Sequence, residues 1–284
     1  PIFQYAKGNS TMSSLKPWRL LLYVALLGAA AFYLMPVYVL LVTGLKSFAE
    51  VSLANMWRLP DGFHLDNFAA AFNVLSPNLI NSVIIATVGS ILASLLGSVN
   101  GYLFSKWRFR GSDLLFTAIL FGMFIPYQSV LIPLVRFMHT IGLYGSLSGV
   151  ILTHVIYGIP ITTLIFRNYY AGIPDEMVEA ARIDGAGVFR VYLHIMLPMA
   201  IPGFVVTLIW QFTSLWNDFL FAVALTSPDK WPVTVALQNL AGTHVVAWNV
   251  QMAGALLAAL PTLFIYIFLG RFFLRGLMSG ALKA

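Results

Sequence analysis

The sequence contains no cysteine and few charged residues. With Cys 0 among 284 residues, disulfide bonds, thiolate metal ligands and cysteine nucleophiles are all excluded. Charged residues make up 9% of the chain and hydrophobic residues 60%. A soluble fold with this composition would lack the polar side chains needed to cover its surface, so the composition predicts a membrane protein.

Several short motifs of enzymes are also missing. No GxxxxGK[ST] segment occurs, so the chain has no glycine-rich loop to hold nucleotide phosphates and is not expected to hydrolyse ATP itself. No HExxH or GxSxG segment occurs either, and Leu147 stands at the nucleophile position of the segment that begins at Gly145. An intramembrane enzyme would need a second buried catalytic group beside Asp218 or His154, and the sequence shows no obvious one.

Long charge-free intervals predict six membrane-spanning helices. One span needs roughly 20 predominantly apolar residues. The intervals are Leu20–Leu45, Asn67–Ser105, Leu114–Val135, Phe137–Phe166, Val191–Asn217 and Trp231–Gly270. Four of the helices are predicted to occupy only part of their interval or to extend slightly past it. Spans two, four, five and six are placed at about Leu79–Phe104, Ser146–Phe166, Pro202–Leu225 and Gln251–Gly270. We therefore expect an all-α membrane protein with one domain over residues 1–284, in which residues 1–16 form a disordered or N-terminal tail.

The basic residues predict the orientation of these spans. Twelve of the sixteen basic residues fall on one side of a six-span arrangement: Lys7, Lys16, Arg19, Lys106, Arg108, Arg110, Arg167, Arg182, Arg190, Arg271, Arg275 and Lys283. The positive-inside rule makes that side the cytoplasm, so both termini are expected there. The formal net charge of +6 then reflects orientation and contact with membrane lipid rather than binding of nucleic acid.

One long stretch between the predicted spans has the pattern of a water-exposed helix. Pro174 suits the first turn of a helix, and the two carboxylates that follow it favour the positive end of the helix dipole. The pattern predicts a helix over Pro174–Asp184 that ends at Gly185 in a left-handed conformation. A second, more apolar segment, Val188–Leu197, follows before Pro198 and Pro202.

This stretch resembles the EAA loop of the permease subunits of binding-protein-dependent ABC importers. The resemblance is carried by seven residues in fixed spacing: Glu179, Ala180, Ala181, Gly185, Ile195, Leu197 and Pro198. A pattern of this length between hydrophobic segments is far more specific than a short motif. The alternative is an ordinary amphipathic helix at the membrane surface.

The resemblance implies a fold, a set of partners and a coupling site. It implies the type I ABC importer permease fold in the bacterial inner membrane, with residues 168–200 as a cytoplasmic coupling loop. The expected partners are a second permease subunit, an ATPase dimer and an extracytoplasmic substrate-binding protein, with ATP and magnesium bound by the ATPase and no cofactor in this chain. The residues expected to couple to the ATPase are Glu179, Ala180, Ala181, Asp184, Gly185 and Ala186.

A second resemblance concerns the transported solute. Trp216, Asn217 and Asp218 are similar to the WND or WNE element of the carbohydrate-importing branch of these permeases. The ending, residues 276–283, resembles the C-terminal tail of the second permease of maltose-type importers. An acid in a predicted span is costly and indicates function by default. Tyr127 and Gln128 follow Pro126 in the third span, where irregular polar backbone indicates a pathway wall. We expect these residues to line a sugar pathway; the alternatives are another solute, or a polytopic membrane enzyme or scaffold.

Two features of the spans leave alternatives open. Small residues recur at every fourth position through Gly89, Ala93, Gly97 and Gly101. This face can pack against another helix of the same chain or against the partner permease. His154 lies in the fourth predicted span without a second ligand at metal spacing, so it is either a hydrogen-bonded packing residue or a functional group.

Overall fold

The computed structural model describes residues 17–107, 109–240 and 246–281, and the predicted tail 1–16 and Arg108 lie outside them. Within these ranges the chain is helical, and its one β-bridge joins Gly145 and Thr226. The four longest helices are α1 (Pro17–Gly44), α2 (Asp66–Lys106), α5 (Leu147–Ala171) and α12 (Trp248–Ala281). The shorter elements are η1 (Phe48–Glu50), α3 (Ser112–Phe121), η2 (Gly122–Phe124), α4 (Tyr127–Thr140), α6 (Asp175–Ile183), α7 (Val188–Val191), η3 (Tyr192–Met196), α8 (Leu197–Met199), α9 (Ile201–Trp216), α10 (Leu220–Leu225), η4 (Pro228–Lys230) and α11 (Val233–Leu240).

The described helices include four that are long and apolar enough to cross a membrane as single helices. Two further pairs pass the same test together but are bent, by 97° between Ser112–Phe124 and Tyr127–Thr140 and by 75° between Val188–Met199 and Ile201–Trp216. The predicted all-α membrane fold is confirmed, and the count reaches six spans when each bent pair is one span.

The third predicted span is broken rather than straight. Pro126 forms the N-cap of α4, and Ile125 before it is extended, with φ −74° and ψ 115°. The ring of a proline disfavours the helical conformation of the residue before it, so the helix stops and restarts. The prediction of one helix over Leu114–Val135 was therefore wrong. α4 instead continues to Thr140, and left-handed Gly142 and Gly145 then reverse the chain before α5.

The fifth predicted span ends earlier than expected. Helix α9 stops at Trp216, and α10 begins at Leu220. The Asp218 carboxylate accepts hydrogen bonds from the backbone N–H groups of Phe221 at 3.4 Å and Ala222 at 2.9 Å. An aspartate that bonds the first free N–H groups favours a new helix start over continuation of the old helix. A single helix over Pro202–Leu225 was thus a wrong prediction.

Helix α2 is longer than predicted. Its 41 residues join the predicted span to the preceding segment, and Pro77 lies inside it. At 1.5 Å per residue the helix is about 60 Å long, twice the usual thickness of the hydrocarbon core of a membrane. Ala71 and Leu75 are fully buried, and both lie near Gly254 of α12. This packing extends the helix beyond the range that local sequence signals predicted.

The small-residue face of α2 packs inside the chain. A Cβ atom at Gly97 would lie 2.2 Å from Thr162 Oγ1, and one at Gly101 would lie 2.6 Å from Phe166 Cβ. Such distances mean that the backbones of α2 and α5 approach closely because no side chain separates them. Of the two alternatives that the sequence left open, this face therefore packs against a helix of the same chain and not against a partner permease.

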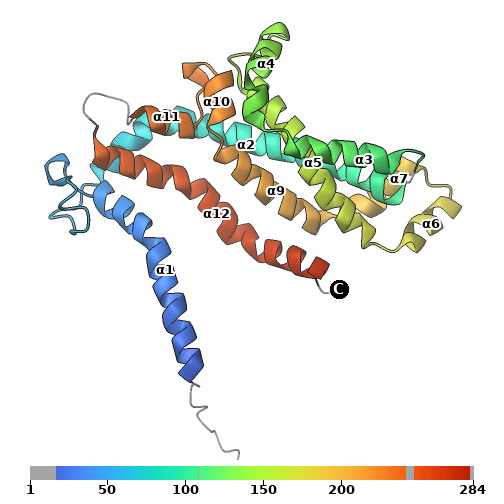
Figure 1. Ribbon diagram of the computed structural model, residues 1–284, viewed down its shortest axis with the longest axis horizontal. Coiled ribbons are helices and arrows are strands. Elements are labelled where there is room, and N and C mark those ends of the chain that lie inside the picture. The colour runs from blue at the N-terminus through green and yellow to red at the C-terminus, as the bar shows by residue number, and fades with distance from the viewer. Residues whose placement is uncertain (1–16, 108, 241–245, 282–284) are drawn as a thin grey trace, which may run out of the picture.

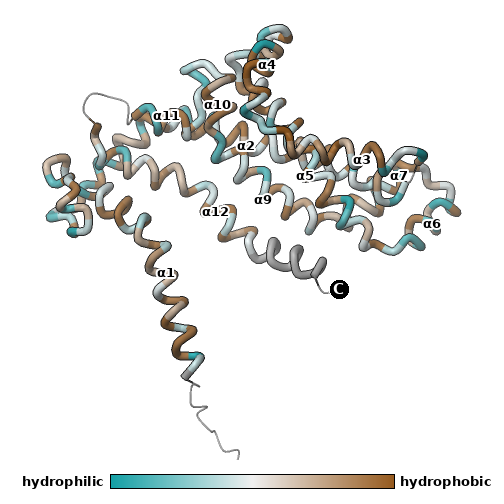
Figure 2. The backbone as a smooth tube through the Cα atoms, viewed as in Figure 1, coloured by the Kyte–Doolittle hydropathy of each residue, from teal (hydrophilic) through white to brown (hydrophobic). Residues whose placement is uncertain are grey.

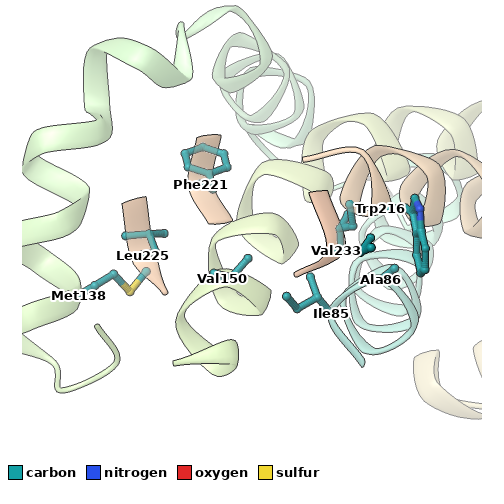
Figure 3. Close-up of a cluster of buried hydrophobic side chains, with 9 residues drawn as sticks. Ile85, Ala86, Met138, Val150, Trp216, Phe221, Leu225 and Val233 are labelled. Atoms are coloured by element: carbon teal, nitrogen blue, oxygen red, sulfur yellow. The ribbon is translucent and has the colours of Figure 1, made fainter. Parts of the chain in front are cut away.

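The buried core of the protein lies away from helix α1, which is exposed over most of its length. One cluster of buried residues joins α2, α4, α5, α9, α10 and α11, including Ile85, Met138 and Val150 (Figure 3). By contrast, only the C-terminal end of α1 contacts α12, and the N-terminal part of α1 points away from the other helices (Figure 1). Its most apolar window is 0% buried, and its surface is strongly hydrophobic (Figure 2). An apolar helix in this position needs lipid or another protein around it.

Candidate functional site

The helix with the EAA pattern ends as its sequence predicts. Helix α6 begins after Pro174 at its N-cap, and its first turn carries Asp175 and Glu176. Gly185 has φ +81°, which confirms the predicted left-handed residue. The N–H of Gly185 donates to the carbonyl of Arg182 at 3.0 Å, and the N–H of Ala186 donates to that of Ala181 at 2.9 Å. These bonds satisfy carbonyl groups that a helix end would otherwise leave unpaired.

One face of α6 is buried and the other is open. Val178 is 3% exposed and belongs to a core cluster with Tyr102, Phe166 and Tyr170. Glu179, Ala180, Asp184 and Gly185 are exposed, whereas Ala181 and Ala186 are half-buried. The outer surface also presents two large apolar side chains, Ile183 at 87% and Phe189 at 77% exposure. Exposed apolar groups beside carboxylates are typical of a surface that binds another protein.

Glu179 makes no ion pair within the described residues. A pair with Arg182, three residues along the helix, would give Glu179 a purely local role, and the structure does not form it. The Arg182 guanidinium instead lies 4.0 Å from the centre of the Trp107 ring. The Glu179 carboxylate is therefore free to accept hydrogen bonds from a partner. It also borders a hollow of about 390 Å³ between α6 and the end of α2.

A larger cavity lies at the break between α9 and α10. Its volume is about 690 Å³, and it is lined by Tyr127, Asn217 and Asp218 of the predicted pathway residues. The other lining residues were not among the predicted pathway residues, although His154 was noted as a possible functional group: His154, Tyr157, Trp210, Thr213, Ser214, Phe219, Leu220, Phe221 and Tyr266. The helices α4, α5, α9, α10 and α12 all contribute to this wall. Hence the predicted third-span and fifth-span residues do meet, at one cavity.

Two predicted pathway residues do not line this cavity. Trp216 is 3% exposed, and its indole Nε1 donates to the carbonyl of Ala258 on α12 at 3.0 Å. Its ring stacks on Phe212 with the ring centres 5.6 Å apart, so it is a packing residue. Gln128 is exposed on the first turn of α4 beside Tyr127 and is not part of the wall. Side chains at successive helix positions point about 100° apart, so Tyr127 faces the cavity and Gln128 next to it does not.

His154 and Asp218 meet at the cavity wall. The distance between His154 Nε2 and Asp218 Oδ2 is 3.3 Å, and the two side chains are 8% and 13% exposed. Sequence reasoning noted both residues but did not pair them, because no local spacing links α5 to the α9–α10 break. The Asp218 carboxylate thus lies beside a polar side chain. It is held by the hydrogen bonds from the two N–H groups of α10.

The cavity can bind a polar solute with flat apolar faces. Aromatic rings offer stacking surfaces, while the Asn217 amide, the hydroxyl groups of Thr213 and Ser214 and the Asp218 carboxylate offer hydrogen-bonding groups. Among the described residues, no group of three or more His, Cys, Asp and Glu side chains could hold a metal ion.

The fold and these two sites define a polytopic membrane protein with an exposed short helix, α6, and a cavity of about 690 Å³ between its helices. Residues 93–278 match the family of binding-protein-dependent transport system inner membrane components, and the chain belongs to this family. The family is one of transport proteins, which confirms the predicted ABC permease class and rules against the enzyme alternative.

Curated relatives span nearly the whole chain. A probable ABC transporter permease of Pyrococcus horikoshii is 47% identical over 96% of this chain and 100% of its own length. The xylose/arabinose import permease of Haloferax volcanii is 34% identical over 88% of this chain and 89% of its own. The glucose import system permease of Saccharolobus solfataricus is 33% identical over 90% and 92%.

Solved structures show the same fold. A chain from a bacterial ABC transporter involved in import of the acidic polysaccharide alginate has a TM-score of 0.80, with 20% identity, over 96% of this chain and 99% of that chain. A chain of the MetNI methionine ABC transporter in an inward-facing conformation has a TM-score of 0.56, with 17% identity, over 73% and 98%. These similarities confirm the predicted type I ABC importer permease fold.

Proposed function

We propose that this chain is one of two membrane subunits of an ATP-driven importer for a sugar or oligosaccharide. The observation that carries the proposal is α6, which is seated on the core through Val178 and presents Glu179 and a left-handed Gly185 outward. Relatives that import xylose, arabinose and glucose support a carbohydrate as the solute. The aromatic and hydroxyl-rich cavity suits the same class of ligand.

The energy for transport comes from a partner. The chain has no phosphate-binding loop, so ATP and magnesium belong to an ATPase dimer. Helix α6 docks in a cleft of one ATPase subunit, where Glu179 accepts hydrogen bonds from the partner and Ile183 fills an apolar contact. Closure of the ATPase dimer then displaces α6 and the spans attached to it. The cavity alternates between the two sides of the membrane as a result.

A second permease completes the pathway. The small-residue face of α2 is already used by α5, so it is not the seam between subunits. The apolar surface of α1 and the outward face of α12 remain for lipid and for the second permease. An extracytoplasmic binding protein delivers the solute to the opposite end of the complex. We assign the complex to the bacterial inner membrane.

The test of this function is uptake by the reconstituted complex. The chain, coexpressed with a second permease and an ATPase from the same organism, is expected to copurify with both in mild detergent. In vesicles loaded with ATP, the complex and its binding protein should accumulate a labelled pentose, glucose or a short oligosaccharide. A panel of amino acids serves as the control. Uptake of amino acids without any sugar would contradict the carbohydrate assignment, and lack of an ATPase partner would contradict the importer.

The orientation provides a separate prediction. Cysteines introduced singly at Ser52, in the first outer loop, and at Asp184, after α6, are both exposed on a background without other thiols. Because the positive-inside rule places the basic side in the cytoplasm, an impermeant thiol reagent should label the Ser52 variant in intact cells and the Asp184 variant only after permeabilisation. The reverse pattern would invert the topology.

A further inference from the structure

Helix α6 is attached to α2 at both of its ends. At its start, Lys106 Nζ lies 2.5 Å from Asp175 Oδ1 and 2.5 Å from the carbonyl oxygen of Ile173. At its end, the Arg182 guanidinium lies over the Trp107 ring, and its Nη2 donates to the carbonyl of Lys106 at 3.4 Å. Lys106 is the last residue of α2 and Trp107 is its C-cap. Lys106 and Trp107, at the C-terminal end of α2, therefore contact both ends of α6.

These contacts are unlike an ordinary surface ion pair. The Lys106 side chain is only 4% exposed, although that of Asp175 is 75% exposed. An ammonium group so far removed from water depends on its protein partners, whereas two exposed groups would be held weakly. The stacking of a guanidinium on an indole ring adds a second attraction. Between the two contacts, Val178 is buried against Tyr102 of α2, so α6 cannot shift alone without exposing this core.

The N-terminal half of α2 is bound to the segment before α11. The side-chain amides of Asn78 and Asn81 donate to the carbonyl of Trp231 at 2.7 and 3.1 Å. The hydroxyl of Ser82 accepts from the N–H of Val233 at 2.8 Å. Helix α2 runs without a break between these contacts and α6, and α11 and α6 lie far apart along it (Figure 1).

The main-chain route from α6 to α9 is more compliant. It passes through α7, the π-helical turn Tyr192–Met196 and the 75° bend before α9. The π-helical turn and the bend interrupt the regular hydrogen-bond ladder or the direction of the helix. In the other direction, residues 172–174 join α6 to the unbroken helix α5. A displacement of α6 thus reaches α9 along a segmented path and reaches α2 directly through Lys106 and Trp107.

We propose that Lys106 and Trp107 are positioning residues that make α6 and α2 one rigid unit. A partner that displaces α6 then moves α2 as a whole and, through it, the Trp231–Val233 segment, which is bound about 36 Å away along the helix. The proposal rests on the proposed function, because it assigns the route by which the ATPase acts on the opposite side of the membrane. It predicts that the contact between Lys106 and Asp175 persists through the transport cycle.

The first test uses substitutions in the complete complex, reconstituted in vesicles with its ATPase dimer and binding protein. Lys106→Met and Asp175→Asn should leave the ATPase bound and its basal hydrolysis within about twofold of the wild type. Stimulation by loaded binding protein, and uptake with it, should fall at least tenfold. Asp113→Asn is the matched control, since Asp113 is also exposed and pairs with Arg167 at 3.5 Å but does not touch α6. Uptake at the wild-type rate in Lys106→Met and Asp175→Asn would overturn the proposal.

The second test replaces the ion pair with a covalent link. In the variant with Lys106→Cys and Asp175→Cys, uptake should be low and should recover when a short bifunctional thiol reagent joins the two positions. Loss of folding cannot mimic this recovery, because the same purified complex is assayed before and after linking. Failure to recover would show that the two positions separate during transport, which contradicts a rigid unit. A wild-type complex that imports nothing would instead contradict the proposed function itself.

Discussion

Replacement of Gly185 by valine is expected to abolish solute uptake while the membrane spans stay folded. Gly185 has φ +81°, and no atom lies within 4 Å of the place where a Cβ would stand, so the constraint is the backbone conformation and not a lack of space. A β-branched side chain in the left-handed region costs at least about 1–2 kcal/mol. The end of α6 should therefore unwind or tilt, and the surface that carries Glu179 and Ile183 should be lost.

Gly187→Val is the matched control for this prediction. Gly187 also has an open surrounding, but its φ is −75° and its ψ is 171°, a conformation that valine adopts readily. We expect Gly185→Val to reduce uptake more than tenfold and Gly187→Val to reduce it less than threefold, at equal amounts of purified permease. Glu179→Lys should reduce uptake as much as Gly185→Val does, because it reverses the charge on the docking surface. It should do so without straining the backbone of α6. Normal uptake in both Gly185→Val and Glu179→Lys would remove α6 from the coupling mechanism.

Asp218→Asn is expected to impair uptake strongly and the amount of folded protein only slightly. The amide oxygen of asparagine can still accept from one of the two N–H groups, such as that of Ala222 at 2.9 Å, so the start of α10 can be retained. It removes the negative charge that faces His154 at 3.3 Å and the cavity. Asp218→Leu removes the cap as well, which should cost about 1 kcal/mol or more and lower the yield of the complex.

A second His–Asp pair in the chain provides the control. His64 and Asp66 lie 3.6 Å apart on the surface, with the Asp66 side chain 79% exposed. Asp66→Asn should leave both yield and uptake unchanged, because exposed pairs contribute little. Uptake and yield are to be measured on the same membranes for each variant. If Asp218→Asn lowers yield while transport per folded complex is normal, Asp218 is a structural residue only.

The two sites differ in how far the sequence could predict them. The end of α6 follows from local rules: a proline and acidic residues begin the helix, and a glycine supplies the left-handed residue that ends it. These requirements involve neighbours in the chain, so reading the sequence was sufficient to place Gly185. The exposed position of Glu179 follows from the same helix, because Val178 next to it is the buried residue.

The cavity wall depends on contacts between distant residues, and there the sequence prediction was only partly correct. Tyr127, Asn217 and Asp218 line the wall, but Trp216 faces α12, because the rotation of α9 is set by packing across the bundle. The pairing of His154 with Asp218 required the break after Trp216. That break is stabilised by the Asp218 side chain itself, a bond that no hydrophobic periodicity reveals. The break at Pro126, by contrast, was visible in the sequence as a proline in a span.

The divergence of α1 has a consequence for how the unfolding of this subunit should be interpreted. Because the most apolar window of α1 is 0% buried and its contact with α12 lies near one end, its helical state is almost independent of the rest of the chain. Unfolding of the isolated subunit is then not a single cooperative transition. A denaturation midpoint measured on it would describe the bundle from α2 onward. Helix α1 would unfold together with the rest of the subunit only in a complex in which other subunits pack around it.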